Sequence, residues 1–343
     1  MKEALLYETL TDKCVQCQLC AHRCTIAEGK SGLCHVRENR AGTLYTLVYG
    51  NVIARHADPV EKKPLSHFYP GSSIYSVATP GCNFRCKWCQ NWEISQMPRE
   101  RNLIPDTKMS PEETVEAAKG LDCAGIAYTY TEPTIFFEYA YDTSKLAHQE
   151  GLVNIFVTNG YMTGEMLELY APHLDAANVD LKAFRDETYR KYVGARLQPV
   201  LDSLKLMKEL GIWLEVTTLL IPDLNDDLVE LQDTARFISQ ELGVETPWHI
   251  SRFFPSYKMS DVPPTPNATL RRAEEIGREA GLRHVYTGNL PGEANTVCHA
   301  CGQLLIRRVG FRVLENNVAP DGQCPECGTP VSGVKMTGAK GLA

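Results

Sequence analysis

The chain has 343 residues, 43% hydrophobic and 22% charged, a composition typical of a soluble globular protein. Its net charge of −7 and the lack of a Lys/Arg-rich run argue against a nucleic-acid partner. No apolar run approaches the roughly 20 residues that cross a bilayer, and the N-terminus does not resemble a signal peptide, so we expect a cytoplasmic protein without a membrane partner.

Thirteen cysteines are present, and twelve of them fall into three groups along the chain. In a reducing compartment, grouped thiols indicate metal or redox chemistry rather than disulfides. Cys123 stands alone, and its position before an apolar strand predicts a core residue.

The first group of cysteines lies in residues 1–41, which we interpret as a Cys-rich metal-binding head. One ligand set has the spacing of bacterial ferredoxin ligands, although Thr25 replaces the usual following proline: Cys14, Cys17, Cys20 and Cys24. A second set is equally able to close around one metal: Cys17, Cys20, Cys24 and Cys34. A zinc ion and a second iron–sulfur cluster are nearly even alternatives for this head.

The next segment, residues 42–72, is predicted to form a β-hairpin and a linker, because β-prone runs between Tyr45 and Ala54 flank a Gly-Asn turn. From residue 73 to 290, apolar β runs alternate with helical patterns. The predicted strands are 73–79, 125–130, 154–158, 176–181, 213–218, 248–253 and 284–287. The predicted helices are 110–120, about 163–171, 200–210, 228–242 and 269–280. Ser110 and Glu113 form a capping box at the first helix.

This alternation amounts to six strand–helix units and indicates an α/β fold with parallel strands. The loops at the C-terminal ends of the strands are then expected to carry the chemistry. Periodicity alone does not distinguish a barrel from a doubly wound sheet.

The last group of cysteines predicts a zinc-ribbon-like module over residues 291–335, followed by a tail over 336–343. Two Cys-x2-Cys knuckles flank a β-prone stretch, and together they offer four thiolates to one tetrahedral ion: Cys298, Cys301, Cys324 and Cys327. We expect structural zinc here, with a rubredoxin-like iron site as the alternative.

The middle group directly follows the first predicted barrel strand and has the spacing Cys-x3-Cys-x2-Cys: Cys82, Cys86 and Cys89. Thiolates are the usual protein ligands of a 4Fe–4S cluster, and three of them leave one iron open. An open iron can chelate a small molecule through an amine and a carboxylate. A three-cysteine zinc site is the alternative.

These residues resemble the defining motif of the radical S-adenosylmethionine (SAM) superfamily, and the resemblance extends over about residues 73–287. It implies a partial (β/α)6 radical SAM barrel and a 4Fe–4S cluster on the three cysteines. It further implies an electron donor such as ferredoxin or flavodoxin and cleavage of SAM to a 5′-deoxyadenosyl radical.

The resemblance also implies roles for four residues in binding SAM. Trp88 is expected beside the adenine. Glu132, in a Tyr-Thr-Glu-Pro sequence similar to the Gly-Gly-Glu-Pro of many members, is expected near the methionyl ammonium. Asp180 and Lys182 lie in a sequence similar to the branch that contains pyruvate formate-lyase activating enzyme, and are expected near the methionyl group.

Residues 58–65, 89–96, 248–253 and 285–289, together with both Cys modules, are similar to the AmmeMemoRadiSam-system radical SAM enzyme. That family is named for encoded neighbours and supplies no substrate, and it favours the head ligand set that includes Cys34. We predict hydrogen abstraction from an unidentified small molecule that binds near Trp92, His249, Arg252 and Tyr286. The alternatives are a glycyl-radical-enzyme activase acting on a partner protein, and a multi-metal scaffold or nucleic-acid-binding protein.

Overall fold

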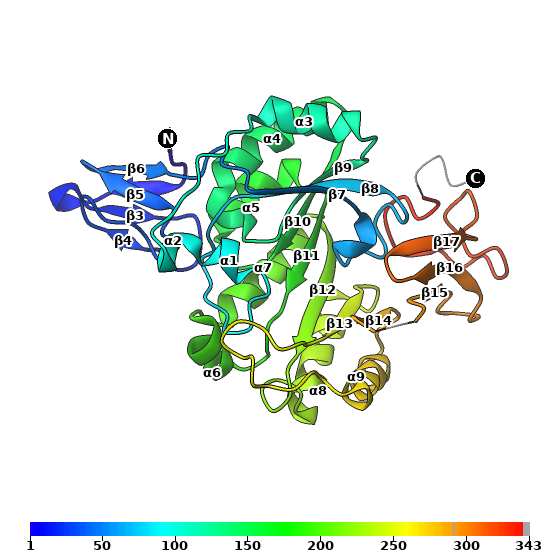
Figure 1. The fold of residues 1–343 in the computed structure, drawn as a ribbon. Helices are drawn as coiled ribbons and strands as arrows, with labels where there is room; N and C mark the ends of the chain where they lie inside the picture. The colour runs from blue at the N-terminus through cyan, green and yellow to red at the C-terminus, as the bar shows by residue number, and fades with distance from the viewer. Residues whose placement is uncertain (291, 339–343) are drawn as a thin grey trace.

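The computed structural model describes residues 1–290 and 292–338. Figure 1 shows a large central sheet, with the head at one side and the C-terminal module at the other. The eight strands of the sheet lie in the order β14-β13-β12-β11-β10-β9-β8-β7. Their bounds are β7 Ala54–Pro59, β8 Ser73–Ala78, β9 Gly125–Tyr128, β10 Val153–Thr158, β11 Ala176–Asp180, β12 Trp213–Leu220, β13 Trp248–Arg252 and β14 Val285–Gly288.

Strands β8 to β14 are mutually parallel, and only the edge strand β7 runs antiparallel to its neighbour. Their spatial order is also their chain order, so every crossover advances in the same direction. A doubly wound sheet would reverse direction at a switch point, whereas a singly wound one curls into a barrel. The partial barrel predicted from the sequence is therefore confirmed.

The connecting helices match the predicted pattern with one addition. They are α3 Pro111–Gly120, α4 Phe137–Gln149, α5 Gly164–Tyr170, α7 Gln198–Glu209, α8 Leu228–Phe237 and α9 Asn267–Glu279. The capping box at α3 is present, since Glu113 N donates to Ser110 Oγ and Ser110 N donates to the Glu113 carboxylate. Helix α4 was not predicted, because it has no side-chain cap and its first turns are rich in aromatic residues. Shorter helical turns are α1 Trp92–Ser95, α2 Met97–Glu100 and α6 Asp186–Thr188.

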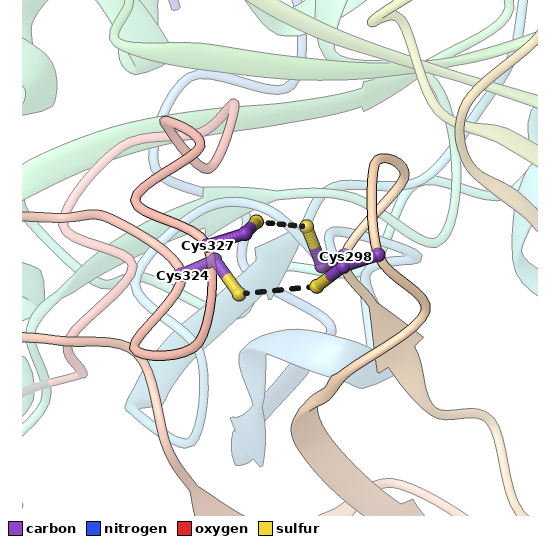
Figure 2. Close-up of side chains that lie close together, drawn as sticks. Cys298, Cys324 and Cys327 are labelled. Atoms are coloured by element: carbon purple, nitrogen blue, oxygen red, sulfur yellow. Dashed lines mark hydrogen bonds between the residues drawn. The ribbon is translucent and has the colours of Figure 1, made fainter.

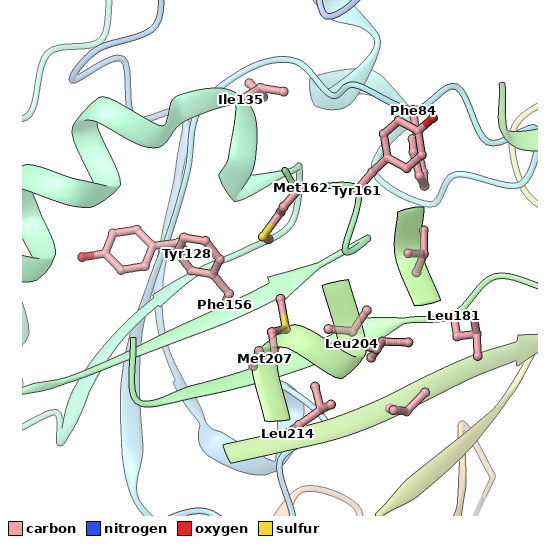
Figure 3. Close-up of a cluster of buried hydrophobic side chains, with 14 of the residues drawn as sticks. Phe84, Tyr128, Ile135, Phe156, Tyr161, Met162, Leu181, Leu204, Met207 and Leu214 are labelled. Atoms are coloured by element: carbon pink, nitrogen blue, oxygen red, sulfur yellow. The ribbon is translucent and has the colours of Figure 1, made fainter. Parts of the chain in front are cut away.

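The barrel core holds the central cysteine loop in place. Phe84, which lies between two of its cysteines, packs edge-on against Tyr161 at 5.2 Å between ring centroids. Figure 3 shows this pair at the margin of the apolar cluster formed by the strands and by Leu204 and Met207 of α7. The predicted core residue Cys123 is also buried.

The predicted hairpin over residues 45–54 is wrong. Gly50 and Asn51 do form a turn, but the strand before it, β6 (Thr43–Thr46), pairs with β1 (Lys2–Glu3) and β5 (Arg37–Arg40) of the head. The strand after the turn is β7, which pairs with β8 of the barrel. Strand β7 pairs with the open edge of the barrel sheet at β8, and β6 pairs within the head. The turn therefore connects two different sheets and not two paired strands.

The two flanking modules are small antiparallel sheets. The head contains a second sheet of β2 Tyr7–Thr9, β3 Val15–Cys17 and β4 Thr25–Ile26. The C-terminal module contains β15 Thr296–Val297, β16 Leu304–Val309 and β17 Arg312–Asn316, as its β-prone stretch predicts. Among the described residues, no helix has the length and apolar character needed to span a bilayer.

Candidate functional site

A cavity of about 650 Å³ lies at the C-terminal ends of the parallel strands. The loop after β8 contributes Cys82, Cys86 and Cys89 to its wall. Later strand ends contribute further polar groups: Glu132, Asn159, Asp180, Lys182, Thr217, His249, Ser251 and Tyr286. The parallel topology therefore brings residues more than 200 positions apart to one site.

The environment of the three cysteines suits an iron–sulfur cluster. Phe84 N–H donates to Cys82 Sγ at 3.3 Å, and Ser95 Oγ lies 3.3 Å from Cys89 Sγ. Burial raises the pKa of Cys86 to about 12, so this thiol ionises only when a metal replaces its proton. One buried and two partly buried sulfur ligands, all in the wall of one cavity, fit a 4Fe–4S cluster with one open iron.

Asp180 and Lys182 form an ion pair at the end of β11, with 2.7 Å between Oδ2 and Nζ. Burial alone would lower the pKa of Lys182, but Asp180 outweighs it and holds that pKa above its usual value. Both side chains line the cavity beside the cysteines. The pair is therefore part of the cavity wall, and its contact with SAM stays a prediction.

Glu132 is fully buried and joins two strand ends. Its Oε1 accepts hydrogen bonds from the Thr134 amide at 3.0 Å and hydroxyl at 2.6 Å, and from the Thr158 hydroxyl at 2.7 Å. Its Oε2 accepts from Asn159 N–H at 2.8 Å. Glu132 thus fixes the loop that follows β9 against the end of β10. Trp88 is buried and lines the same cavity, and the roles of both residues toward SAM stay predictions.

The substrate-facing residues predicted from the sequence divide into two pairs. His249 and Tyr286 line the cavity. Trp92 and Arg252 are not among its lining residues, although their neighbours Asn91 and Ser251 are, and a role for them near the substrate stays a prediction. Trp92 instead stacks on Tyr257 at 5.2 Å between ring centroids, and Arg252 Nε donates to a backbone carbonyl at 2.9 Å, which draws both side chains to other parts of the molecule.

Glu215 is a buried site residue that the sequence analysis missed. Its carboxylate accepts from His249 Nε2 at 2.6 Å, from Trp213 Nε1 at 3.1 Å and from the amides of Ser66 and His67 at 3.0 and 2.8 Å. Burial would raise the pKa of Glu215, but these donors outweigh it and lower that pKa. An acidic residue inside the apolar strand β12 is the signal that could have revealed it. Glu215 orients His249 at the cavity wall.

A directed chain of hydrogen bonds joins the barrel to the C-terminal module. Arg308 Nη1 donates to Thr296 Oγ1 at 2.7 Å, and Thr296 Oγ1 lies 2.8 Å from Tyr286 Oη. Tyr286 Oη lies 2.6 Å from His67 Nε2, while His67 Nδ1 lies 2.7 Å from the carbonyl oxygen of Ser332. Because a carbonyl only accepts, His67 carries a proton on Nδ1. Burial lowers the pKa of His67 to about 4, so near neutral pH the ring has no proton on Nε2 and accepts there from the Tyr286 hydroxyl.

We expect this neutral histidine to make the fold sensitive to acid. Burial lowers the pKa of His67 from 6.5 to about 4, so below pH 6.5 the unfolded chain takes up a proton that the folded chain does not. Stability is therefore present above pH 6.5 and is lost as the pH falls towards 4. Between pH 7 and pH 5 the loss from His67 should be about 2 kcal/mol.

Denaturant unfolding at the two pH values measures this effect, with His67→Gln as the comparison. The His67→Gln variant should be less stable than the wild type at both pH values. Between pH 7 and pH 5, however, its free energy of unfolding should fall by about 2 kcal/mol less than that of the wild type. An equal pH dependence in the two proteins would rule out His67 as its source.

The four C-terminal cysteines come together as their spacing predicts. Two sulfur–sulfur contacts are short, 3.7 Å between Cys298 and Cys327 and 3.7 Å between Cys301 and Cys324. Figure 2 shows Cys324 and Cys327 on one side of the group, facing Cys298 on the other. All four sulfur atoms lie within 4.8 Å of one another. Tetrahedral zinc with Zn–S bonds of about 2.3 Å would separate its sulfurs by about 3.8 Å. The group is therefore the right size for one tetrahedral ion.

Four cysteines of the head line a second, small cavity: Cys17, Cys20, Cys24 and Cys34. Cys14 is not among its lining residues. Of the two ligand sets that the spacing allows, the geometry supports the one that includes Cys34.

This barrel, with a cysteine triad at the end of its first parallel strand, is the architecture of an enzyme class that cleaves SAM. The sequence matches the radical SAM superfamily over residues 76–238, and the chain belongs to that superfamily. It is 48% identical to the uncharacterized protein MJ0808 of Methanocaldococcus jannaschii over 96% of this chain and 99% of that one.

Two further comparisons agree with this assignment. Over 48% of the chain and 69% of the relative, the sequence is 23% identical to the pyruvate formate-lyase-activating enzyme of Clostridium pasteurianum. The fold resembles that of a radical SAM methyltransferase from Sphaerobacter thermophilus, with a TM-score of 0.51, 17% identity, and coverage of 69% of this chain and 71% of that one.

Proposed function

We propose that the chain cleaves SAM reductively and uses the resulting radical to remove hydrogen from a small polar molecule held in the 650 Å³ cavity. The main support is the position of Cys82, Cys86 and Cys89 in the wall of that cavity. When bound there, a 4Fe–4S cluster supplies the electron that breaks the sulfonium bond of SAM.

The chain's own residues would then bind and orient the reactants. Asp180 and Lys182 offer one charge of each sign, which suits the ammonium and carboxylate of the SAM methionyl group. Trp88 offers an aromatic face to the adenine. Glu215 holds His249 in one orientation, so the imidazole can hydrogen-bond a polar substrate in the cavity.

The choice of a small substrate rests on the residues that close the cavity. Part of the wall comes from the C-terminal module, through Arg308, Gly310 and Phe311. Arg308 is buried and donates to the carbonyl oxygen of Ser66 at 2.7 Å, which ties this module to the barrel. A closed site protects a carbon radical from water and from unintended C–H bonds. A module that forms part of the wall leaves less room for a partner's loop than uncovered strand ends would.

The second candidate is a glycyl-radical-enzyme activase with a protein partner. It is favoured by the similarity to the pyruvate formate-lyase-activating enzyme, whose name describes action on another enzyme. The similarity covers about half of this chain. We prefer a small-molecule substrate because the C-terminal module forms part of the cavity wall.

Deuterium transfer distinguishes the two candidates. The enzyme would be incubated anaerobically with SAM and dithionite in either the small-molecule or the protein fraction of deuterated cells. We expect deuterium to enter 5′-deoxyadenosine with the small-molecule fraction. Deuterium transfer only with the protein fraction, together with a glycyl radical signal there, would establish the activase instead.

We further propose that the four C-terminal cysteines bind one structural zinc ion. A Cys324→Ser, Cys327→Ser variant should lose about one zinc per chain, and its melting temperature should fall before its iron content does. Elemental analysis and thermal unfolding measure the two effects. Iron in place of zinc in the wild-type module would contradict the proposal.

A further inference from the structure

We propose that Cys17, Cys20, Cys24 and Cys34 hold a second 4Fe–4S cluster, which passes single electrons to the cluster at Cys82, Cys86 and Cys89. The first part concerns the head alone. The second part rests on the proposed function, because it gives the electron its destination.

The spacing of the head cysteines distinguishes a cluster from a zinc ion. Within residues 1–290 and 292–338, only the C-terminal cysteines form a set of three or more candidate ligands whose ligand atoms all lie within 4.8 Å. The head cysteines surround a common cavity but are spread more widely, as the central three also are. A four-iron cluster is larger than one ion and holds its thiolates farther apart. In the wide spacing of its cysteines, the head therefore resembles the central site and differs from the four C-terminal cysteines.

Two buried N–H groups with no hydrogen-bond partner belong to residues that line the head cavity. Asn83 Nδ2 has none, although Asn83 Oδ1 accepts from Asn159 at 2.7 Å. Arg37 Nε has none, although the other guanidinium nitrogens bind Glu138 and the carbonyl oxygen of Leu5. Such groups are costly to bury unpaired. The sulfides and thiolates of a cluster are acceptors for both, and Arg37 also offsets their negative charge.

The head packs directly on the central cysteine loop. Gly81, with φ +106°, precedes Cys82, and a Cβ there would lie 2.8 Å from Val36 Cγ1 and 3.5 Å from the Cys34 carbonyl oxygen. His22, between two head ligands, has its Nε2 3.0 Å from the Asn83 carbonyl oxygen. Asn83 is covalently next to Cys82 and also lines the head cavity. One residue therefore separates the two ligand sets, which is a short path for an electron.

The position of the head suits an entry point for electrons. Figure 1 shows it on the side of the barrel away from the C-terminal module, where an external donor can approach without opening the cavity. One electron from a low-potential donor of the ferredoxin or flavodoxin class would reduce the head cluster. The same electron would pass to the central cluster and reoxidise the head cluster. Each electron then cleaves one SAM to methionine and a 5′-deoxyadenosyl radical.

Iron, sulfide and zinc counts on anaerobic wild-type protein test the first part without any variant. We expect about eight irons, eight sulfides and one zinc per chain. About four irons with two zincs would overturn the proposal. The Cys82→Ala, Cys86→Ala, Cys89→Ala variant should keep four irons, with an electron paramagnetic resonance signal that SAM does not change. Four irons in this variant would establish the head cluster even if the protein does not cleave SAM.

Head variants test the relay. Cys24→Ala, Cys34→Ala should keep the SAM-responsive signal and the zinc, which also shows that it is folded, while losing about half of the iron. Reduced ferredoxin should no longer reduce its central cluster rapidly. Dithionite, which reduces that cluster directly, should still do so. Cys14→Ala, whose sulfur does not line the head cavity, is the matched control and should behave as wild type. Unchanged reduction by ferredoxin in the head variant would refute the relay.

Discussion

Replacing Cys82, Cys86 and Cys89 together with alanine should abolish the release of 5′-deoxyadenosine from SAM. The three cysteines line the cavity, and the sulfurs of Cys82 and Cys89 have hydrogen-bond partners that a cluster would keep. Changes to groups that merely support metal ligands cost about 10- to 100-fold, so loss of all three ligands should exceed 100-fold. Chromatographic quantification of 5′-deoxyadenosine under anaerobic reducing conditions measures this loss.

The matched control for this variant is Cys123→Ala, which removes a thiol that is buried away from the site. It should retain SAM cleavage. Cleavage that survives in the triple variant would show that another part of the chain performs the reaction.

Replacing Arg308 with methionine should lower the free energy of unfolding by about 3–5 kcal/mol, as removing one partner of a buried ion pair does. Arg308 is 1% exposed and its Nε lies 3.4 Å from Oε1 of Glu61, a carboxylate that is itself buried. Methionine preserves most of the side-chain volume, so the loss reports on charge and hydrogen bonds. Denaturant unfolding of the two proteins gives the difference.

Arg307→Met provides the control for the Arg308 variant at the adjacent residue. Arg307 pairs with Glu293 and Glu315 on the surface, where ion pairs contribute at most about 1 kcal/mol. Limited proteolysis should also cut the C-terminal module faster in Arg308→Met than in Arg307→Met. Equal losses in the two variants would mean that Arg308 does not fasten the module to the barrel.

The sequence predicted those features of the fold that depend on local patterns. Parallel strands, the capping box at Ser110 and the cysteine loop after β8 all follow from spacing within short windows. The hairpin prediction failed because Gly50 and Asn51 identify a turn, whereas the partners of the flanking strands lie in two different sheets. Helix α4 was not predicted, because its aromatic residues pack into the core and it has no side-chain cap.

The candidate site was predictable where its residues fall in motifs and unpredictable where they meet through the fold. Cys82, Asp180 and Lys182 stand at strand ends, so topology alone brings them to one edge of the sheet. Glu215 and His67 come together across 148 positions, and Arg308 reaches Ser66 across 242. No periodicity within a strand encodes such pairs, and only the folded chain reveals them.

The central claim is reductive cleavage of SAM at the cavity formed by the strand ends, and product identity tests it most directly. Wild-type protein purified without oxygen would be mixed with SAM and dithionite, and the nucleoside products separated by mass spectrometry. We expect 5′-deoxyadenosine and methionine in equal amounts, accumulating slowly without substrate. Methylthioadenosine or S-adenosylhomocysteine as the sole product would contradict radical cleavage.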